Sequence, residues 1–223
     1  PSCYGDFNGD ISLSFNGGTP PYSATYGPDT FTSVNDSSAI ISNLPAGSGS
    51  IFVVDSNGCE TTYFETLESK LELMLDVFIS DTIDCFGGEN GSLSANVVGG
   101  TPQYNYYLIS ENDTIESVSN SFIELSSGEY LLQVYDENNC TKEEIVSINS
   151  PEEIEIIQDM SSCYGSILID VLNVTGDYDI IWQGDIADSS YIDSLYPGTY
   201  QVTVFDDLGC YKVDSFVVNK IFD

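Results

Sequence analysis

The sequence predicts an all-β protein made of tandem Ig-like antiparallel β-sandwich domains, with one disulfide in each domain. Apolar and polar residues alternate along many segments, for example 11–15, 71–77 and 130–134, and a period of two is typical of half-buried strands. Clusters of Gly, Pro, Asn and Asp separate these segments at intervals of about ten residues, the spacing expected of a sandwich. No segment shows a convincing helical pattern.

The cysteines divide the chain into three similar parts. Each opening cysteine is followed by an aromatic residue and Gly, and each closing cysteine follows a turn that begins with Asp. The opening cysteines are Cys3, Cys85 and Cys163, and the closing cysteines are Cys59, Cys140 and Cys210. We therefore predict three Ig-like repeats, over residues 1–69, 70–151 and 152–223, of which the first lacks its first strand.

One opening and one closing cysteine in each repeat favour disulfides within repeats, although many other pairings are open. The predicted pairs are Cys3–Cys59, Cys85–Cys140 and Cys163–Cys210. Closing a loop of about 50 residues stabilises a domain by about 4 kcal/mol in the chain-entropy model. Disulfides also indicate an oxidising compartment. A zinc site is disfavoured because the chain has no Cys-x-x-Cys pair and no histidine.

The charge is strongly acidic, with 36 Asp and Glu against 4 Lys, no Arg and no His, for a formal charge of −32. Such a surface repels nucleic acid and anionic lipid and favours cations. No apolar run approaches the ~20 residues of a membrane helix, so we expect no membrane insertion. Without histidine the usual general acid or base is missing, and each repeat is too small for a large cleft. We expect no catalytic residues and no enzyme.

A turn of sequence Gly-Gly-Thr-Pro-x-Tyr occurs in the first two repeats, at 17–22 and 99–104. Its glycines supply backbone angles that other residues avoid. Its tyrosine, Tyr22 or Tyr104, is expected to return to the core, and sugar binding by exposed tyrosines is the alternative. The single tryptophan, Trp182, is also expected in the core, the usual place for a sandwich tryptophan.

Asp6, Asn8 and Asp10 place oxygen ligands at alternate positions of one loop, an arrangement that suits Ca²⁺. The loop lacks the downstream bidentate glutamate of an EF-hand. Asn8 followed by Gly9 also predicts a simple hairpin turn. We expect no cofactor other than this candidate calcium ion.

The two ends of the chain resemble cuts within a longer array. Repeats 2 and 3 have a predicted strand before their opening cysteine, at 70–83 and 152–160, whereas repeat 1 has only two residues there. Residues 220–223 align with the start of a further first strand. We expect either a segment of a longer chain whose signal and anchor lie elsewhere, or a partner chain that donates the missing strand.

The succession Cys-Tyr/Phe-Gly, Asn-Gly, Gly-Gly-Thr-Pro-x-Tyr, Leu-x-x-Gly and Asp-x-x-Gly/Asn-Cys resembles the SprB-type repeat of giant cell-surface adhesins in gliding Bacteroidota. The match is strong in repeats 1 and 2 and weaker in repeat 3. The resemblance implies a secreted array of many repeats, exported by a type IX system and involved in adhesion and gliding. Three tripeptides also resemble the O-glycosylation sequence of those bacteria, with Thr82, Thr114 and Ser194 as acceptors.

We therefore predict a structural repeat segment of a secreted adhesin filament, located extracellularly on a cell surface and associated with the outer membrane. Its expected partners are further repeats of the same chain and an external surface or polysaccharide. The alternatives are a glycan- or protein-binding module, with calcium as a stabiliser, and a subunit of a fibre assembled by strand donation.

Overall fold

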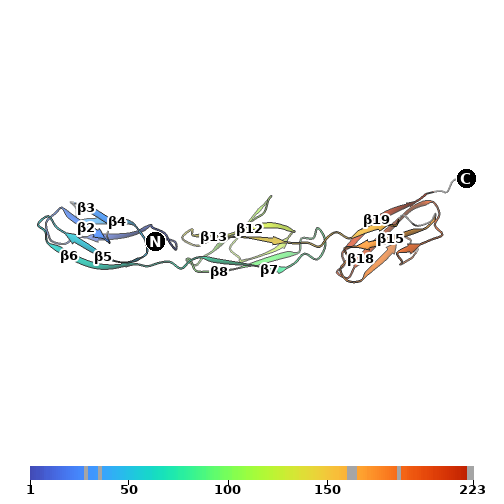
Figure 1. Ribbon diagram of the computed structural model, residues 1–223, viewed down its shortest axis with the longest axis horizontal. Coiled ribbons are helices and arrows are strands. Elements are labelled where there is room, and N and C mark those ends of the chain that lie inside the picture. The colour runs from blue at the N-terminus through green and yellow to red at the C-terminus, as the bar shows by residue number, and fades with distance from the viewer. Residues whose placement is uncertain (28–29, 35–36, 160–164, 185–186, 220–223) are drawn as a thin grey trace. The chain divides into compact units, whose positions relative to one another are not determined.

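A computed structural model describes residues 1–27, 30–34, 37–159, 165–184 and 187–219, and these residues form nineteen strands and no helix. Every strand pairing with a defined register is antiparallel. The all-β, antiparallel prediction is therefore confirmed, and Figure 1 shows the strands along the chain. The described part of the chain contains no helix able to span a bilayer.

The chain divides into two compact units, which combine segments distant in sequence. The first unit contains Pro1–Val77, Ala95–Asn120 and Leu131–Ile145, and the second contains Phe78–Ser94, Ser121–Tyr130 and Val146–Asp223. The predicted middle repeat contributes to both units. The repeat boundaries at 1–69, 70–151 and 152–223 stay a prediction.

The first unit contains a two-sheet sandwich. In one sheet β1 (Gly9–Ser14) pairs with β4 (Ser38–Leu44), and the other sheet has the order β3 (Thr30–Val34), β2 (Tyr22–Tyr26), β5 (Gly47–Val54), β6 (Glu60–Leu67). Alternate residues of these strands point inward and form one apolar core: Ile11, Ala24, Ile41, Leu44, Ile51 and Val53. A further sheet has the order β10 (Thr114–Ser117), β9 (Asn105–Ile109), β12 (Gly128–Tyr135), β13 (Thr141–Ile148).

The second unit contains β11 (Ser121–Leu125), residues 91–94 of β8 (Gly91–Val98) and residues 78–81 of β7 (Met74–Asp81), together with a second sandwich. One sheet of this sandwich has the order β14 (Glu155–Gln158), β15 (Ile167–Leu172), β17 (Tyr191–Ile192). The other has the order β16 (Tyr178–Trp182), β18 (Gly198–Asp206), β19 (Tyr211–Val218).

Trp182 lies in the core of the second sandwich, as predicted. Its side chain is 0% exposed and its ring centroid lies 6.4 Å from that of Phe216. The indole N–H donates a hydrogen bond to the Ser189 carbonyl oxygen at 2.9 Å. Trp182 therefore acts as a core residue with a satisfied polar atom.

The tyrosines of the Gly-Gly-Thr-Pro-x-Tyr turns return to the protein as predicted. Tyr22 is buried, and its hydroxyl donates to the Gly17 carbonyl oxygen at 2.8 Å. The Tyr104 hydroxyl donates to the Gly99 carbonyl oxygen at 2.7 Å in the same way. Each tyrosine thus fastens the start of its own turn.

The predicted disulfide pairing within repeats is wrong. Cys3 is bonded to Cys140 and Cys85 is bonded to Cys210. Cys59 has no disulfide and is exposed. The predicted pair Cys163–Cys210 is excluded because Cys210 bonds Cys85, and Cys163 itself lies outside the described residues.

The physical reason is the direction of the strands. In repeat 1 the opening turn precedes Gly9, which pairs with Leu44 near the start of β5. The closing turn follows Val54 at the other end of β5. This strand of 8 residues is roughly 26 Å long at about 3.3 Å per residue. A disulfide needs Cα atoms within about 7 Å, so Cys3 and Cys59 of one repeat cannot bond.

Candidate functional site: the disulfide clasps

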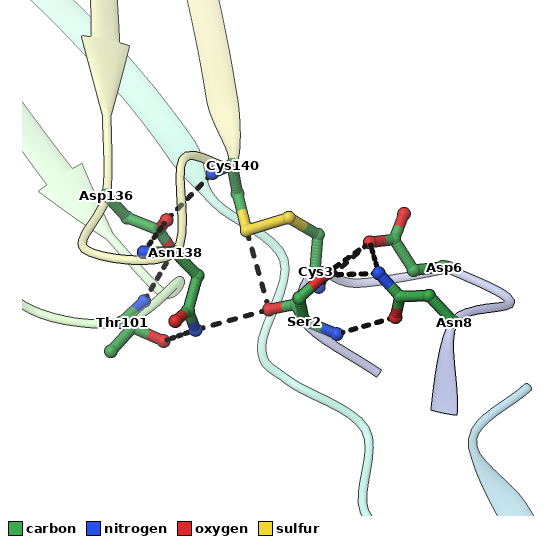
Figure 2. Close-up of a disulfide and its surroundings, with 8 residues drawn as sticks. All are labelled: Ser2, Cys3, Asp6, Asn8, Thr101, Asp136, Asn138 and Cys140. Atoms are coloured by element: carbon green, nitrogen blue, oxygen red, sulfur yellow. Dashed lines mark hydrogen bonds between the residues drawn. A yellow bond between two sulfur atoms is a disulfide. The ribbon is translucent and has the colours of Figure 1, made fainter. Parts of the chain in front are cut away.

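The closing turn of repeat 2, residues 136–140, is organised by the carboxylate of Asp136 (Figure 2). One carboxylate oxygen, Oδ1, accepts the backbone N–H groups of Asn138 at 2.9 Å and Cys140 at 2.8 Å. The other oxygen, Oδ2, accepts the N–H of Thr101 at 2.7 Å. Asp136 therefore orients Cys140 and ties its turn to the Gly-Gly-Thr turn.

The same arrangement occurs in the other two repeats. Asp55 accepts the N–H groups of Cys59 and Thr19, each at 2.9 Å. Asp206 accepts the N–H of Cys210 at 2.9 Å and of Thr175 at 3.2 Å. The sequence pattern showed that Asp recurs before the closing cysteine, and the structure shows why: its carboxylate accepts the backbone donors of the turn.

These contacts favour the ionised carboxylate form of Asp55. The N–H of Cys59, and next that of Thr19, lower the pKa of the Asp55 carboxyl below its ordinary value. Hydrogen bonds from backbone donors stabilise a carboxylate and not its protonated form. The closing turn of repeat 1 is therefore formed around a charged group.

The opening turns of repeats 1 and 2 share one hydrogen bond, in which the side-chain oxygen of Asn8 or Asn90 accepts the N–H of the residue before the opening cysteine. In repeat 1 the Cys3 N–H donates to Asp6 Oδ2 at 3.1 Å and the Ser2 N–H donates to Asn8 Oδ1 at 2.9 Å, as Figure 2 shows. In repeat 2 the Asn90 amide donates to Asp84 at 2.7 Å. Asn8 and Asn90 each lie five residues after the opening cysteine, and each hydrogen-bonds to the residue before that cysteine.

Each disulfide joins the opening turn of one repeat to the closing turn of the next, and we call this arrangement a clasp. The Cα atoms are 5.6 Å apart in Cys3–Cys140 and 5.4 Å apart in Cys85–Cys210. The carbonyl oxygen before the opening cysteine lies beside the closing sulfur, at 3.6 Å for Ser2 and Cys140 and at 3.3 Å for Asp84 and Cys210. The two clasps are thus alike in bonding and in contacts.

A side-chain hydrogen bond adds to the first clasp. The Asn138 amide donates to the Ser2 carbonyl oxygen at 3.3 Å and to Thr101 Oγ1 at 2.8 Å (Figure 2). Asn138 therefore bridges the two turns that the disulfide joins. Leu208 holds the corresponding position in the second clasp and has no such donor.

Two lysines form ion pairs next to the clasps. Each lies two residues after a closing cysteine: Lys142 pairs with Glu72 at 4.0 Å and Lys212 pairs with Glu153. Hydrogen bonding to Glu153 raises the pKa of Lys212. Both pairs are partly exposed, so solvent screens them and they contribute little to stability. They join the last strand of a hairpin to the segment that enters the same repeat.

The candidate calcium ligands Asp6, Asn8 and Asp10 have different structural roles. Asp6 and Asn8 hydrogen-bond within the opening turn, as described above, and Asp10 is an exposed residue of β1. Among the residues that the structure describes, no group of three or more His, Cys, Asp or Glu side chains is placed to hold a metal. Calcium binding stays a prediction.

The candidate glycosylation residues Thr82, Thr114 and Ser194 are all exposed. The Thr114 N–H donates to Asp113 Oδ1 at 2.8 Å, and the Ser194 hydroxyl donates to Asp193 at 3.2 Å. Modification at these positions stays a prediction.

The fold and the clasps define a class of protein, an all-β extracellular repeat module whose consecutive repeats are joined by disulfides. Two segments of the chain, residues 1–23 and 79–112, match the model of the SprB repeat. These segments are SprB-type repeat sequence, and each runs from near an opening cysteine to or beyond a Gly-Gly-Thr turn. Disulfides and SprB-type repeats together indicate an extracellular or cell-surface location. No curated protein matches the chain.

Several solved structures resemble the chain weakly. The amphioxus IgVJ-C2 molecule is 12% identical over 65% of this chain and 97% of its own, with a TM-score of 0.32. The N-terminal eight Ig domains of the Down syndrome cell adhesion molecule are 14% identical over 96% and 39%, with a TM-score of 0.33. Domains 4–9 of the surface layer protein SbsC are 12% identical over 94% and 40%, with a TM-score of 0.25. Scores this low carry no argument about function.

Proposed function

We propose that this chain is a structural stretch of a secreted cell-surface adhesin filament that serves adhesion and gliding motility. The observation that carries the proposal is the repetition of the clasp: Cys3–Cys140 and Cys85–Cys210 join an opening turn to the closing turn of the following repeat. A repeated covalent link between neighbouring repeats suits an element that must transmit force. Such a link has no role in a catalytic site or in a site for a single ligand.

The clasp gives each junction two covalent connections. The backbone continues from β6 through the short segment 68–73 to β7, and the disulfide between Cys3 and Cys140 crosses in parallel. A loop of the length that Cys3–Cys140 closes stabilises the folded chain by about 5 kcal/mol in the chain-entropy model. A junction held in this way resists separation even when one connection is loaded.

The acidic surface supports the same role. With a formal charge of −32 and only 4 Lys, neighbouring copies repel one another and few sites are open to trypsin-like proteases. High net charge of one sign also opposes aggregation. Both properties suit a long exposed segment outside the cell.

The proposal is tested on cells that produce the protein, with fluorescent antibody fragments raised against the whole chain. We expect intact cells to be labelled, and the label to move along the surface of gliding cells. Deletion of the coding region should reduce attachment to glass. Labelling that appears only after the cells are permeabilised would contradict the proposal.

A second candidate function is a glycan- or protein-binding module. Strand β6 presents Tyr63 at 61% exposure and Phe64 at 83% exposure, and exposed aromatic residues are frequent in binding surfaces. Replacement of both by Ser should abolish attachment of beads coated with the protein if the exposed aromatic residues of β6 bind. Unchanged attachment of the beads would leave the structural role as the function of this segment.

A further inference from the structure

The closing turn around Cys59 in repeat 1 has the same hydrogen bonds as the closing turn of the Cys3–Cys140 clasp. Asp55 holds the Cys59 and Thr19 N–H groups as Asp136 holds those of Cys140 and Thr101. The Asn57 amide donates to Thr19 Oγ1 at 2.8 Å, the same distance as in the pair Asn138–Thr101. The turn that presents Cys59 is thus built as in the repeat whose cysteine is bonded.

The difference between the repeats is what covers the cysteine. Cys140 and Cys210 are 9% and 8% exposed, because the opening turn of the preceding repeat lies against each of them. Cys59 is exposed, and within the described residues no opening turn lies on it. Two equivalent cysteines of the same molecule therefore show which group Cys59 lacks.

An open cavity lies beside Cys59. It has a volume of about 250 Å³ and is lined in part by Phe15, Gly18, Tyr22, Cys59 and Tyr63. In repeat 2 the equivalent glycine turn is covered, because the Gly100 N–H donates to the Leu71 carbonyl oxygen at 3.0 Å. The segment that covers this turn in repeat 2 belongs to the same repeat, and among the described residues of repeat 1 no corresponding segment lies over Gly18 beside Cys59.

We propose that Cys59 is a disulfide site for the opening turn of another SprB-type repeat, which it binds as Cys140 binds the turn of Cys3. The incoming carbonyl oxygen before the opening cysteine would meet the Asn57 amide and the Cys59 sulfur, as the Ser2 carbonyl meets Asn138 and Cys140. This inference rests on the clasps alone and holds whether or not the filament serves adhesion.

The bond forms by thiol–disulfide exchange with a low-molecular-weight disulfide, for which oxidised glutathione is the probe. The Cys59 thiolate attacks glutathione disulfide and releases one glutathione as its thiol. The thiolate of the opening cysteine then attacks the mixed disulfide, forms the protein disulfide and releases the second glutathione. Two protein thiols are oxidised and one glutathione disulfide is reduced, so electrons and protons balance.

A symmetric Cys59–Cys59 bond between two copies does not satisfy the same contacts. It would bring two closing turns together, each with the charged Asp55 carboxylate and with an Asn57 amide that lacks the incoming carbonyl acceptor. Like charges at close range oppose association. The site therefore selects an opening turn over a second closing turn.

The whole chain tests the proposal because its sequence contains one further opening cysteine, Cys163, which lies outside the described residues. Concentrated protein is equilibrated in a glutathione redox buffer, alkylated and digested with a protease that cuts at acidic residues. We expect disulfide-linked oligomers joined by Cys59–Cys163 between chains, at roughly tenfold more than either symmetric link. Either Cys59→Ser or Cys163→Ser should abolish these oligomers.

A second variant separates docking from simple thiol reactivity. Asp55→Asn removes the acceptor for the Thr19 N–H and leaves the thiol in place, so alkylation of Cys59 by iodoacetamide should continue while the Cys59–Cys163 link falls about tenfold. Glu65→Gln, an exposed change on β6, is the matched control and should leave the link unchanged. Statistical mixing of the three links, an intrachain bond or a Cys59 that never links overturns the proposal.

Discussion

At the scale of single residues, the closing turns depend on one carboxylate each. Asp136 is 2% exposed and accepts three backbone N–H groups, those of Asn138, Cys140 and Thr101. A buried charge is tolerated in a protein only where hydrogen bonds replace its hydration. Asp136 meets that condition through the backbone alone, so the turn must close around it for the charge to be stable.

Asp136→Asn should therefore destabilise the chain. The amide keeps one acceptor oxygen and turns an N–H₂ group toward a backbone donor. Loss of charged hydrogen bonds of this kind costs about 2–3 kcal/mol. Urea unfolding followed by circular dichroism measures the change, with the adjacent exposed Glu137→Gln as the control. A difference below about 0.5 kcal/mol, the range of surface substitutions, would contradict the assigned role.

The closing turn of repeat 1 should loosen in acid. The N–H groups of Cys59 and Thr19 lower the pKa of the Asp55 carboxyl below its ordinary value of 3.8. Its stabilising effect is therefore complete above the unfolded pKa and is lost as the pH falls through the lower folded pKa. Amide proton shifts of Cys59 and Thr19 in an NMR titration report this step. The step should vanish in Asp55→Asn, and a midpoint above 3.8 would contradict the sign.

At the scale of elements, the glycine turns and the closing turns are matched in shape. A Cβ atom at Gly100 would lie 2.8 Å from the Asp136 carboxylate, and the backbone there has φ +62°. Gly58 also has a positive φ, +80°, but a Cβ atom there would meet nothing within 4 Å. The two glycines separate the cost of backbone strain from the cost of a steric clash.

Gly58→Ala should cost about 1 kcal/mol, the price of a left-handed backbone for alanine. Gly100→Ala should cost roughly 1–3 kcal/mol more, because the added methyl group displaces the carboxylate that holds the closing turn. Thermal unfolding of the two variants beside the unchanged chain gives the comparison. Equal losses of stability in the two variants would show that the contact of a Cβ atom at Gly100 with Asp136 does not affect the free energy of unfolding.

The strands were predictable from the sequence, whereas prediction of the disulfide partners also required the direction of the strands. The alternating pattern 11–15 overlaps β1 and the pattern 130–134 lies in β12, and Trp182 is buried as expected of a sandwich tryptophan. The pairing prediction treated a repeat as a closed unit. Five strands separate Cys3 from Cys59, and an odd number of antiparallel strands leaves its two ends on opposite sides of a domain.

The other contacts of the clasp could not be predicted from the sequence. That Asp136 accepts from Thr101, 35 residues away, depends on which turns meet at one end of the sandwich. The contact between Asn138 and the Ser2 carbonyl links residues 136 positions apart. Contacts of this range follow from the topology, and alternation within a strand carries no information about them.

At the scale of the whole molecule, the two disulfides enclose overlapping loops. Cys3–Cys140 closes 137 residues and Cys85–Cys210 closes 125, and both loops contain residues 85–140. Each bond therefore spans a junction between predicted repeats. A chain pulled from its ends cannot lengthen one loop without also loading the other disulfide.

Extension of the fully unfolded chain should be limited by the shortest covalent path between its ends. That path runs from Pro1 to Cys3, across to Cys140, back to Cys85, across to Cys210 and on to Asp223. It contains about 70 residues and spans about 250 Å, against about 780 Å for the reduced chain. Single-molecule force spectroscopy measures both lengths.

Cys3→Ser should extend the limit to about 340 Å, whereas Cys59→Ser should leave it unchanged because Cys59 lies on neither bond. A longer limit in Cys59→Ser would restore the pairing within repeats and overturn the clasp.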